Sequence, residues 1–199
     1  MKQRVKRPKE TRRTILDAAG AEFSAHGYAG SGLGAITARA GLTKGALFHH
    51  FSDKRSLAVA WISETLVEAM NRLWTVPLTG IVSLESLKSF TRSRVMEMDS
   101  MDPLAVWVLL SSESSGMNEE FSEALETVST SLRGGIVSTL ETGKTTGWIH
   151  KSIHPEEEAL FLSAALAGFT VTFRTDSRAI TRRRCADSLE AYLETLRAQ

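Results

Sequence analysis

Residues 33–51 constrain the fold of this chain more than any other stretch, because they read as two short helices joined by a tight turn. Leucine and isoleucine in the first helix, and Leu47 and Phe51 in the second, are spaced to bury one apolar side of each helix. Gly41 suits the left-handed conformation that ends a helix, and Thr43 suits the cap of the next one. The pattern predicts a helix-turn-helix, whose second helix can present its N-terminal end to the major groove of DNA.

The charges are divided unevenly along the chain. Residues 1–55 carry eleven Lys/Arg and four Asp/Glu, a net charge of +7, whereas residues 56–199 carry a net charge of −6. A basic head on an acidic body is expected where one end of a protein meets a polyanion. The basic arm from Lys2 to Arg13 could enter the minor groove or touch phosphates, or it could be a solvated tail.

Beyond the head, the sequence is punctuated by prolines at positions 77, 103 and 155 and keeps helical periodicity between them. We therefore expect an all-α protein of about nine helices, with a possible kink at Gly134-Gly135. The expected helices span about 11–25, 33–40, 43–49, 53–74, 84–100, 103–112, 118–142, 155–174 and 179–196.

Several classes of protein are disfavoured by what the sequence lacks. The single cysteine, Cys185, cannot form an intramolecular disulfide, and its register with Leu189 favours a core position over a redox role. There is no apolar run of roughly 18 residues and no signal-peptide pattern, so we expect a soluble cytoplasmic protein without a membrane partner. Because no catalytic signature is present, we expect no enzyme, no catalytic residues and no cofactor. Adjacent His49 and His50 point about 100° apart on a helix, so we expect no metal site.

About 45 residues of the head resemble the DNA-binding domain of the tetracycline-repressor (TetR) family of bacterial regulators, of the TetR/AcrR type. The matching residues are Ile15-Leu16-Asp17-Ala18-Ala19, Phe23, His26-Gly27-Tyr28, Ile36, Ala40-Gly41-Leu42-Thr43-Lys44-Gly45, Leu47-Phe48-His49-His50-Phe51, Asp53-Lys54 and Leu57. The resemblance implies a helix-turn-helix domain over residues 1–53, including the basic arm. It implies a helical-bundle domain for ligand binding and dimerisation over residues 54–199.

The resemblance also implies which residues meet DNA. Three would face the bases or the groove, the histidines would lie near the backbone, and Lys54 would pair with a phosphate. The full candidate set is Ser31, Arg39, Thr43, Lys44, Gly45, Phe48, His49, His50 and Lys54. Two positions depart from the family pattern. Phe48 replaces a tyrosine, which removes a hydroxyl, and Gly32 replaces a Ser or Thr that would cap the helix.

For the body, the resemblance implies a ligand pocket and a dimer interface formed by the last two helices. Candidate pocket residues are Phe90, Met98, Arg94, Trp107, Phe121, Trp148 and Phe169, and the alternative for each is ordinary core packing. Candidate interface residues are Phe161, Ala164, Ala165, Gly168, Leu189, Tyr192, Leu193 and Leu196. The alternative there is a helical hairpin within one chain.

The expected function is a ligand-responsive transcription regulator. As a homodimer it would bind a pseudo-palindromic double-stranded operator, most simply as a repressor that a small-molecule effector releases. An all-helical enzyme, or a ligand carrier or interaction module without DNA function, is the alternative. The basic helix-turn-helix head argues against both.

Overall fold

The computed structural model describes residues 8–198, in which helices joined by turns and loops are the regular elements and no β-strand is formed. The basic-arm residues Lys2, Arg4, Lys6 and Arg7 lie outside the described residues. The helices are α1 (Pro8–Gly30), α2 (Leu33–Ala40), α3 (Lys44–Phe48), α4 (Lys54–Trp61), α5 (Val67–Met70), α6 (Val76–Thr79), α7 (Leu84–Glu97), α8 (Pro103–Ser112), α9 (Glu119–Thr146), α10 (Pro155–Thr175) and α11 (Ala179–Glu194). The all-α prediction is confirmed.

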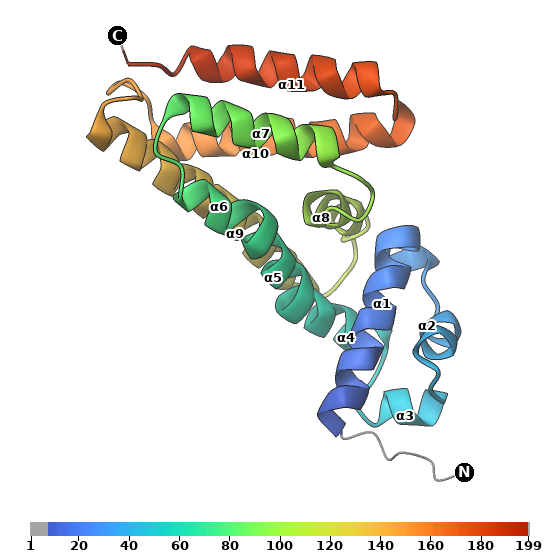
Figure 1. The fold of residues 1–199 in the computed structure, drawn as a ribbon. Coiled ribbons are helices and arrows are strands. Elements are labelled where there is room, and N and C mark those ends of the chain that lie inside the picture. The colour runs from blue at the N-terminus through green and yellow to red at the C-terminus, as the bar shows by residue number, and fades with distance from the viewer. Residues whose placement is uncertain (1–7, 199) are drawn as a thin grey trace.

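The head consists of α1, α2 and α3, with α4 packed against α1 (Figure 1). Apolar side chains from each of these helices are fully buried together, because their helical spacing places them on facing sides. These residues are Ile15, Phe23, Ile36, Leu47 and Leu57. At Gly27 the backbone of α1 leaves the helical conformation (φ 71°, ψ −177°), and helix resumes beyond it to Gly30, whereas the sequence predicts a helix that ends near residue 25.

A single helical rod runs from Lys54 to Thr79 and joins the head to the body. It comprises α4, α5 and α6 and two π-helical turns between them, η1 (Ile62–Leu66) and η2 (Asn71–Thr75). The helix that was expected to end at about residue 74 therefore continues through Pro77 to Thr79. Pro77 lies in the last turn of the rod, directly after the π-helical turn η2, and Gly80 caps the end of the rod.

The body is built around the long α9, which runs alongside the rod, contacts it from α4 to α6, and also contacts α10 and α8 (Figure 1). The expected kink at Gly134-Gly135 is absent, since α9 is one helix across this pair. Gly135 instead permits close packing, because a Cβ there would lie 3.1 Å from Cα of Thr75 in η2. The helix also extends to Thr146, into the region expected to be a loop.

The last helices form a second layer, in which α11 lies along α7 and α10 lies beneath them (Figure 1). Their bounds agree with the expected ones to within about three residues at each end, which is the usual uncertainty of helix ends. Among the described residues, no helix is long and apolar enough to cross a membrane.

Candidate nucleic-acid interface

The turn between α2 and α3 has the geometry that a helix-turn-helix requires. Gly41 adopts the left-handed conformation (φ 64°, ψ 36°), and the N–H of Leu42 donates to the carbonyl of Thr37 over 3.0 Å. The hydroxyl of Thr43 accepts from the N–H of Ala46 over 3.2 Å and caps α3. As expected from Gly32, α2 has no side-chain cap.

The outer face of α3 is exposed and is not covered by the body. Lys44, Gly45 and His49 are exposed on it, and the ring of Phe48 is 50% exposed. His50 is half-buried, and its ring meets that of His49 edge-on at 5.3 Å. No group of metal-ligating side chains was found anywhere between Pro8 and Ala198. Six of the nine candidate residues, with the exposed Thr43 among them, therefore lie on or beside α3.

Two of the candidates are committed to contacts inside the head. Ser31 is buried, and its hydroxyl donates to the carbonyl of Gly27 over 2.6 Å. The expectation that Ser31 meets DNA is therefore corrected: it stabilises the end of α1. Arg39 is exposed, but its Nε donates to the carboxylate of Glu22 at 2.9 Å.

The basic side chains at the edges of this surface differ in their exposure to solvent. The ammonium of Lys54 lies 4.4 Å from the ring centre of Tyr28, and desolvation lowers the pKa of Lys54. Its neighbour Arg55 is exposed. From the sequence, Arg55 counts toward the basic charge of the head and is not among the predicted DNA contacts. Lys9 and Arg13 are exposed on α1. At the start of α4, Arg55 is therefore more accessible to a DNA phosphate than Lys54 is. The resemblance had implied Lys54 alone as the phosphate contact there.

The N-terminus of α4 is already capped. Asp53 accepts from the N–H of Ser56 over 2.7 Å, and the Ser56 hydroxyl accepts from the N–H of Asp53 over 3.2 Å. The bond from the Ser56 backbone lowers the pKa of Asp53, so its carboxylate is charged at neutral pH. A phosphate approaching this terminus would meet a negative charge, which leaves the cations and α3 as the attractive groups.

The head contacts the body mainly at the end of α1. The carboxylate of Glu113, directly after α8, accepts from the N–H of Tyr28 and from the N–H of Ala29 at 3.1 Å. The Tyr28 ring meets that of Phe121 edge-on at 5.3 Å. We call Gly27–Ala29 with Glu113 and Phe121 the junction. Because Phe121 is fully buried there, it is a junction residue and not a pocket residue as expected.

Arg94 and Met98, two more expected pocket residues, are used by the fold itself. Arg94 pairs with the carboxylate of Asp102 and lies 5.1 Å from the ring centre of Trp74, and Met98 is 2% exposed. Asp102 also accepts from the indole N–H of Trp74 over 3.1 Å. Burial raises the pKa of Asp102 even beside the guanidinium. Arg94 therefore has a partner within the chain, and we no longer assign it to an anionic ligand.

The other expected pocket residues are scattered. Phe90 packs against Trp74, Trp148 lies beyond the end of α9, and Phe169 stacks on Phe173 with 6.2 Å between ring centres. Trp107 lines a cavity of about 140 Å³ between α8, α9 and α10. Of the seven residues expected to form one pocket, the structure therefore places Trp107 alone in the wall of this cavity.

The expected interface residues fall into two groups. On α10, Ala164 and Gly168 are exposed and Phe161 is 52% exposed, while Ala165 is half-buried. With Leu160, which is 61% exposed, they form an apolar surface along α10. Tyr192 of α11 joins this surface, since its ring lies 4.7 Å from that of Phe161.

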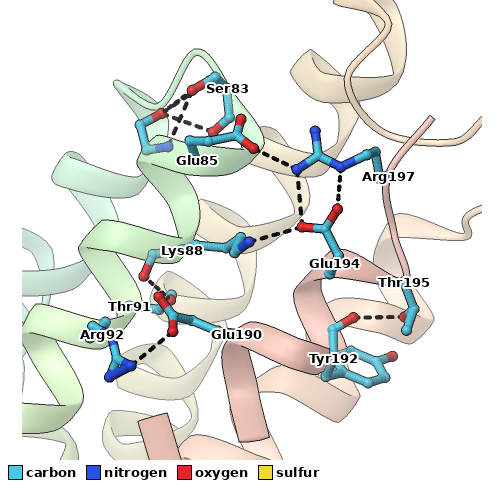
Figure 2. A network of polar contacts seen from close by, with 11 residues as sticks. Ser83, Glu85, Lys88, Thr91, Arg92, Glu190, Tyr192, Glu194, Thr195 and Arg197 are labelled. Atoms are coloured by element: carbon cyan, nitrogen blue, oxygen red, sulfur yellow. Dashed lines mark hydrogen bonds and ion pairs between the residues drawn. The ribbon is translucent and has the colours of Figure 1, made fainter. Parts of the chain in front are cut away.

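The second group, on α11, is buried in the chain's own core, and the expectation for it was wrong. Leu189, Leu193 and Leu196 are at most 4% exposed because α11 packs onto α7. Figure 2 shows the ion pairs that fix this packing, among them Lys88–Glu194 at 2.8 Å, Arg92–Glu190 at 3.0 Å and Arg197–Glu85 at 2.5 Å. Hydrogen bonds from Arg197 and Lys88 lower the pKa of Glu194 to about 2.

Comparison with known proteins places the similarity in the head. A family-wide sequence profile described as bacterial regulatory proteins of the tetR family matches residues 15–61. The HTH-type transcriptional repressor AcnR of Corynebacterium efficiens is 35% identical over 78 residues, 39% of this chain and 40% of the relative. The HTH-type transcriptional regulator AcrR of Shigella flexneri is 48% identical over 48 residues, 24% of this chain and 22% of the relative. The chain thus aligns with less than half the length of these curated relatives.

The fold as a whole also has solved counterparts. The crystal structure of a TetR transcriptional regulator from Chloroflexus aurantiacus superposes with a TM-score of 0.81 at 25% identity, over 96% of this chain and 98% of that one. The similarity in three dimensions therefore extends through the body, where the sequence similarity to the curated relatives ends.

Proposed function

We propose that this chain, whose residues 15–61 match the profile of the tetR family of bacterial regulatory proteins, is a DNA-binding transcription regulator. The observation that carries the proposal is the exposed face of α3, which presents Lys44, Gly45 and His49 beyond a tight, capped turn. Such a helix end fits the major groove, where Lys44 can donate to a guanine edge or a phosphate. The domains we propose are residues 1–53 for DNA and residues 54–199 for control.

We further propose that two copies bind one operator through the apolar surface of α10. An exposed stripe with Leu160, Phe161, Ala164 and Gly168 has small residues that permit close helix approach and large ones that bury apolar area. A two-fold axis through this surface would set two heads on successive major grooves of a pseudo-palindrome. Most simply the dimer is a repressor.

Control by a small molecule would act through the junction. Glu113 follows α8 directly and accepts hydrogen bonds from the backbone of Tyr28 and Ala29 at the end of α1. A movement of α8 would therefore shift the position of α1, and with it the head. A ligand that favours one position of α8 would thereby favour one spacing of the two heads. Regulation, and not catalysis, is the activity we assign to this chain.

Fluorescence anisotropy on DNA fragments from the region upstream of the chain's own gene tests the proposal. We expect one fragment to bind tightly at low salt, with an affinity that falls steeply as salt rises. Lys44→Ala should weaken specific binding by about 10- to 100-fold, the range of about 1–3 kcal/mol for one base contact.

Lys151→Ala is the matched control, because Lys151 is an exposed lysine of the body and the variant has the same net charge. It should bind DNA as the parent does. Weak binding that is equal on all fragments and indifferent to Lys44 would contradict the assignment of α3 as the reading helix.

A further inference from the structure

The cavity of about 140 Å³ that Trp107 lines lies where four helices of the body meet. Met70 of α5, Leu104 and Trp107 of α8, Leu132 of α9 and Leu160 of α10 provide apolar walls. An apolar cavity of about 150 Å³ is large enough to hold a benzene ring. A second cavity, lined by Trp74 and Leu193, measures about 20 Å³ and is too small for any organic ligand.

The walls are fixed in place. The indole N–H of Trp107 donates to the carbonyl of Leu125 over 2.9 Å, so this N–H is not available to an occupant. Leu104 and Leu132 are buried in the core. By its volume and its apolar lining, the cavity therefore suits an apolar group of about the size of a benzene ring.

One wall carries a cation without an acidic partner. Arg133 of α9 lines the cavity, is half-buried, and donates to the hydroxyl of Thr130 over 3.2 Å. Across the described residues it forms no ion pair with a carboxylate. Ser129 of α9 and Ser163 of α10 also line the cavity. A guanidinium has five donors in a planar fork that matches a carboxylate, so most of its donors are available to a ligand.

From the apolar walls and this cation, we propose that the cavity is the effector site and that it takes a small aromatic carboxylate. The inference rests on the proposed regulatory function and names its ligand class. The ring lies between α8 and α10 against Trp107, and the carboxylate faces Arg133.

The position of the cavity explains how its occupant reaches the head. Leu104 and Trp107 are on α8, and Glu113 follows the same helix, about 9 Å beyond Trp107 at 1.5 Å per residue. An occupant wedged between α8 and α10 therefore acts on the helix that ends at the junction. Leu160 and Ala164 line the cavity and also belong to the proposed dimer surface, so a second copy lies beside the mouth.

Isothermal titration calorimetry on the full-length protein without DNA tests the proposal, with benzoate, benzyl alcohol and benzylamine as probes. We expect saturable binding of benzoate, weaker binding of the neutral alcohol and none of the amine. Arg133→Gln should lower the affinity for benzoate at least about tenfold and leave the affinity for benzyl alcohol unchanged, because only a carboxylate accepts the paired N–H bonds of the guanidinium.

Arg72→Gln is the matched control, since Arg72 is exposed on η2 and does not line the cavity. Thermal midpoints of both variants show whether they fold. No saturable benzoate binding at millimolar concentration, or equal binding by parent and Arg133→Gln, would overturn the proposal. The proposal would also be overturned if Arg133→Gln changed only the dimer dissociation constant, since the guanidinium would then contact the second copy and not the ligand. Because no DNA is present, failure here is distinct from failure of the DNA-binding assay.

Discussion

The head and the body of this molecule differ in where their structural information lies. In the head, each decisive conformation is specified within a few residues. Gly41 has a positive φ at the turn, and the side chains of Thr43 and Asp53 each accept a hydrogen bond from the backbone N–H three residues later, which caps α3 and α4. In the body, the decisive contacts join remote segments, such as Arg197 with Glu85 or Thr75 with Ser131. A motif therefore specifies a binding surface locally, whereas a ligand site depends on how distant helices pack.

Gly27 is the position where these two kinds of information meet, and changing it should have the largest effect. Its φ of 71° and ψ of −177° lie in a region open essentially only to glycine, and a Cβ would lie 2.8 Å from Cδ of Glu113. We expect Gly27→Ala to lower the free energy of unfolding by about 3 kcal/mol. At about 2–4 °C per kcal/mol, the thermal midpoint should fall by roughly 10 °C.

A double variant separates the two causes. Gly27→Ala with Glu113→Ala should recover the part due to overlap and keep the part due to the backbone. Gly34→Ala is the control, because Gly34 is exposed in α2 with nothing within 4 Å of its Cβ position. An unchanged midpoint for Gly27→Ala would mean that the junction is not a fixed contact between head and body.

The second prediction concerns the surface on which the body should join a second copy. Phe161→Glu places a charge in the centre of the apolar surface of α10, and both subunits would carry it. We expect the dimer dissociation constant to rise at least about 100-fold, or about 2.7 kcal/mol, in sedimentation equilibrium. Val82→Glu, at a residue that is 76% exposed before α7, has the same charge change and should leave the dimer intact. A Phe161→Glu protein that remains dimeric would remove α10 from the interface.

What sequence could predict follows the same division. The helices of the head, Gly41 at the turn and the cap of α3 by Thr43 were predictable because the responsible residues are close neighbours. The exposure of Lys44 and His49 followed from the same local pattern.

The failures in the body have one physical cause. Helical periodicity assigned Leu189 and Leu193 correctly to an apolar stripe, but a stripe does not reveal whether α7 or a second copy covers it. Arg94 was open to assignment to a ligand because its partner Asp102 lies across a turn. Arg133 could not be predicted as a cavity residue from the sequence, since only the packing of α8 and α10 creates a cavity beside it.

The third prediction tests whether head and body are coupled through a single carboxylate. Glu113→Gln keeps the shape of the side chain and removes its charge, which weakens two charge-assisted bonds from Tyr28 and Ala29. We expect a loss of about 1.5 kcal/mol in the free energy of unfolding and faster hydrogen exchange at these two amides. Glu141→Gln, an exposed glutamate of α9 without an ion pair among the described residues, should change neither. Exchange that is equally slow in Glu113→Gln would place the coupling elsewhere, for instance at Phe121.

The smallest effect should come from two adjacent glycines of α9 and should differ in sign between them. Gly134 is exposed, and nothing lies within 4 Å of the position that a Cβ would take, so Gly134→Ala should stabilise the protein by about 0.5–1 kcal/mol through helix propensity alone. Gly135 gains the same propensity, but its Cβ would lie 3.1 Å from Cα of Thr75, and separating α9 from η2 costs about 1–3 kcal/mol. Urea unfolding should therefore show Gly135→Ala to be less stable than Gly134→Ala by more than about 1 kcal/mol, with equal m-values. Equal stabilisation by both would show that the packing of α9 against η2 adjusts easily, and that the body is less tightly specified by long-range packing than the head is by its turns.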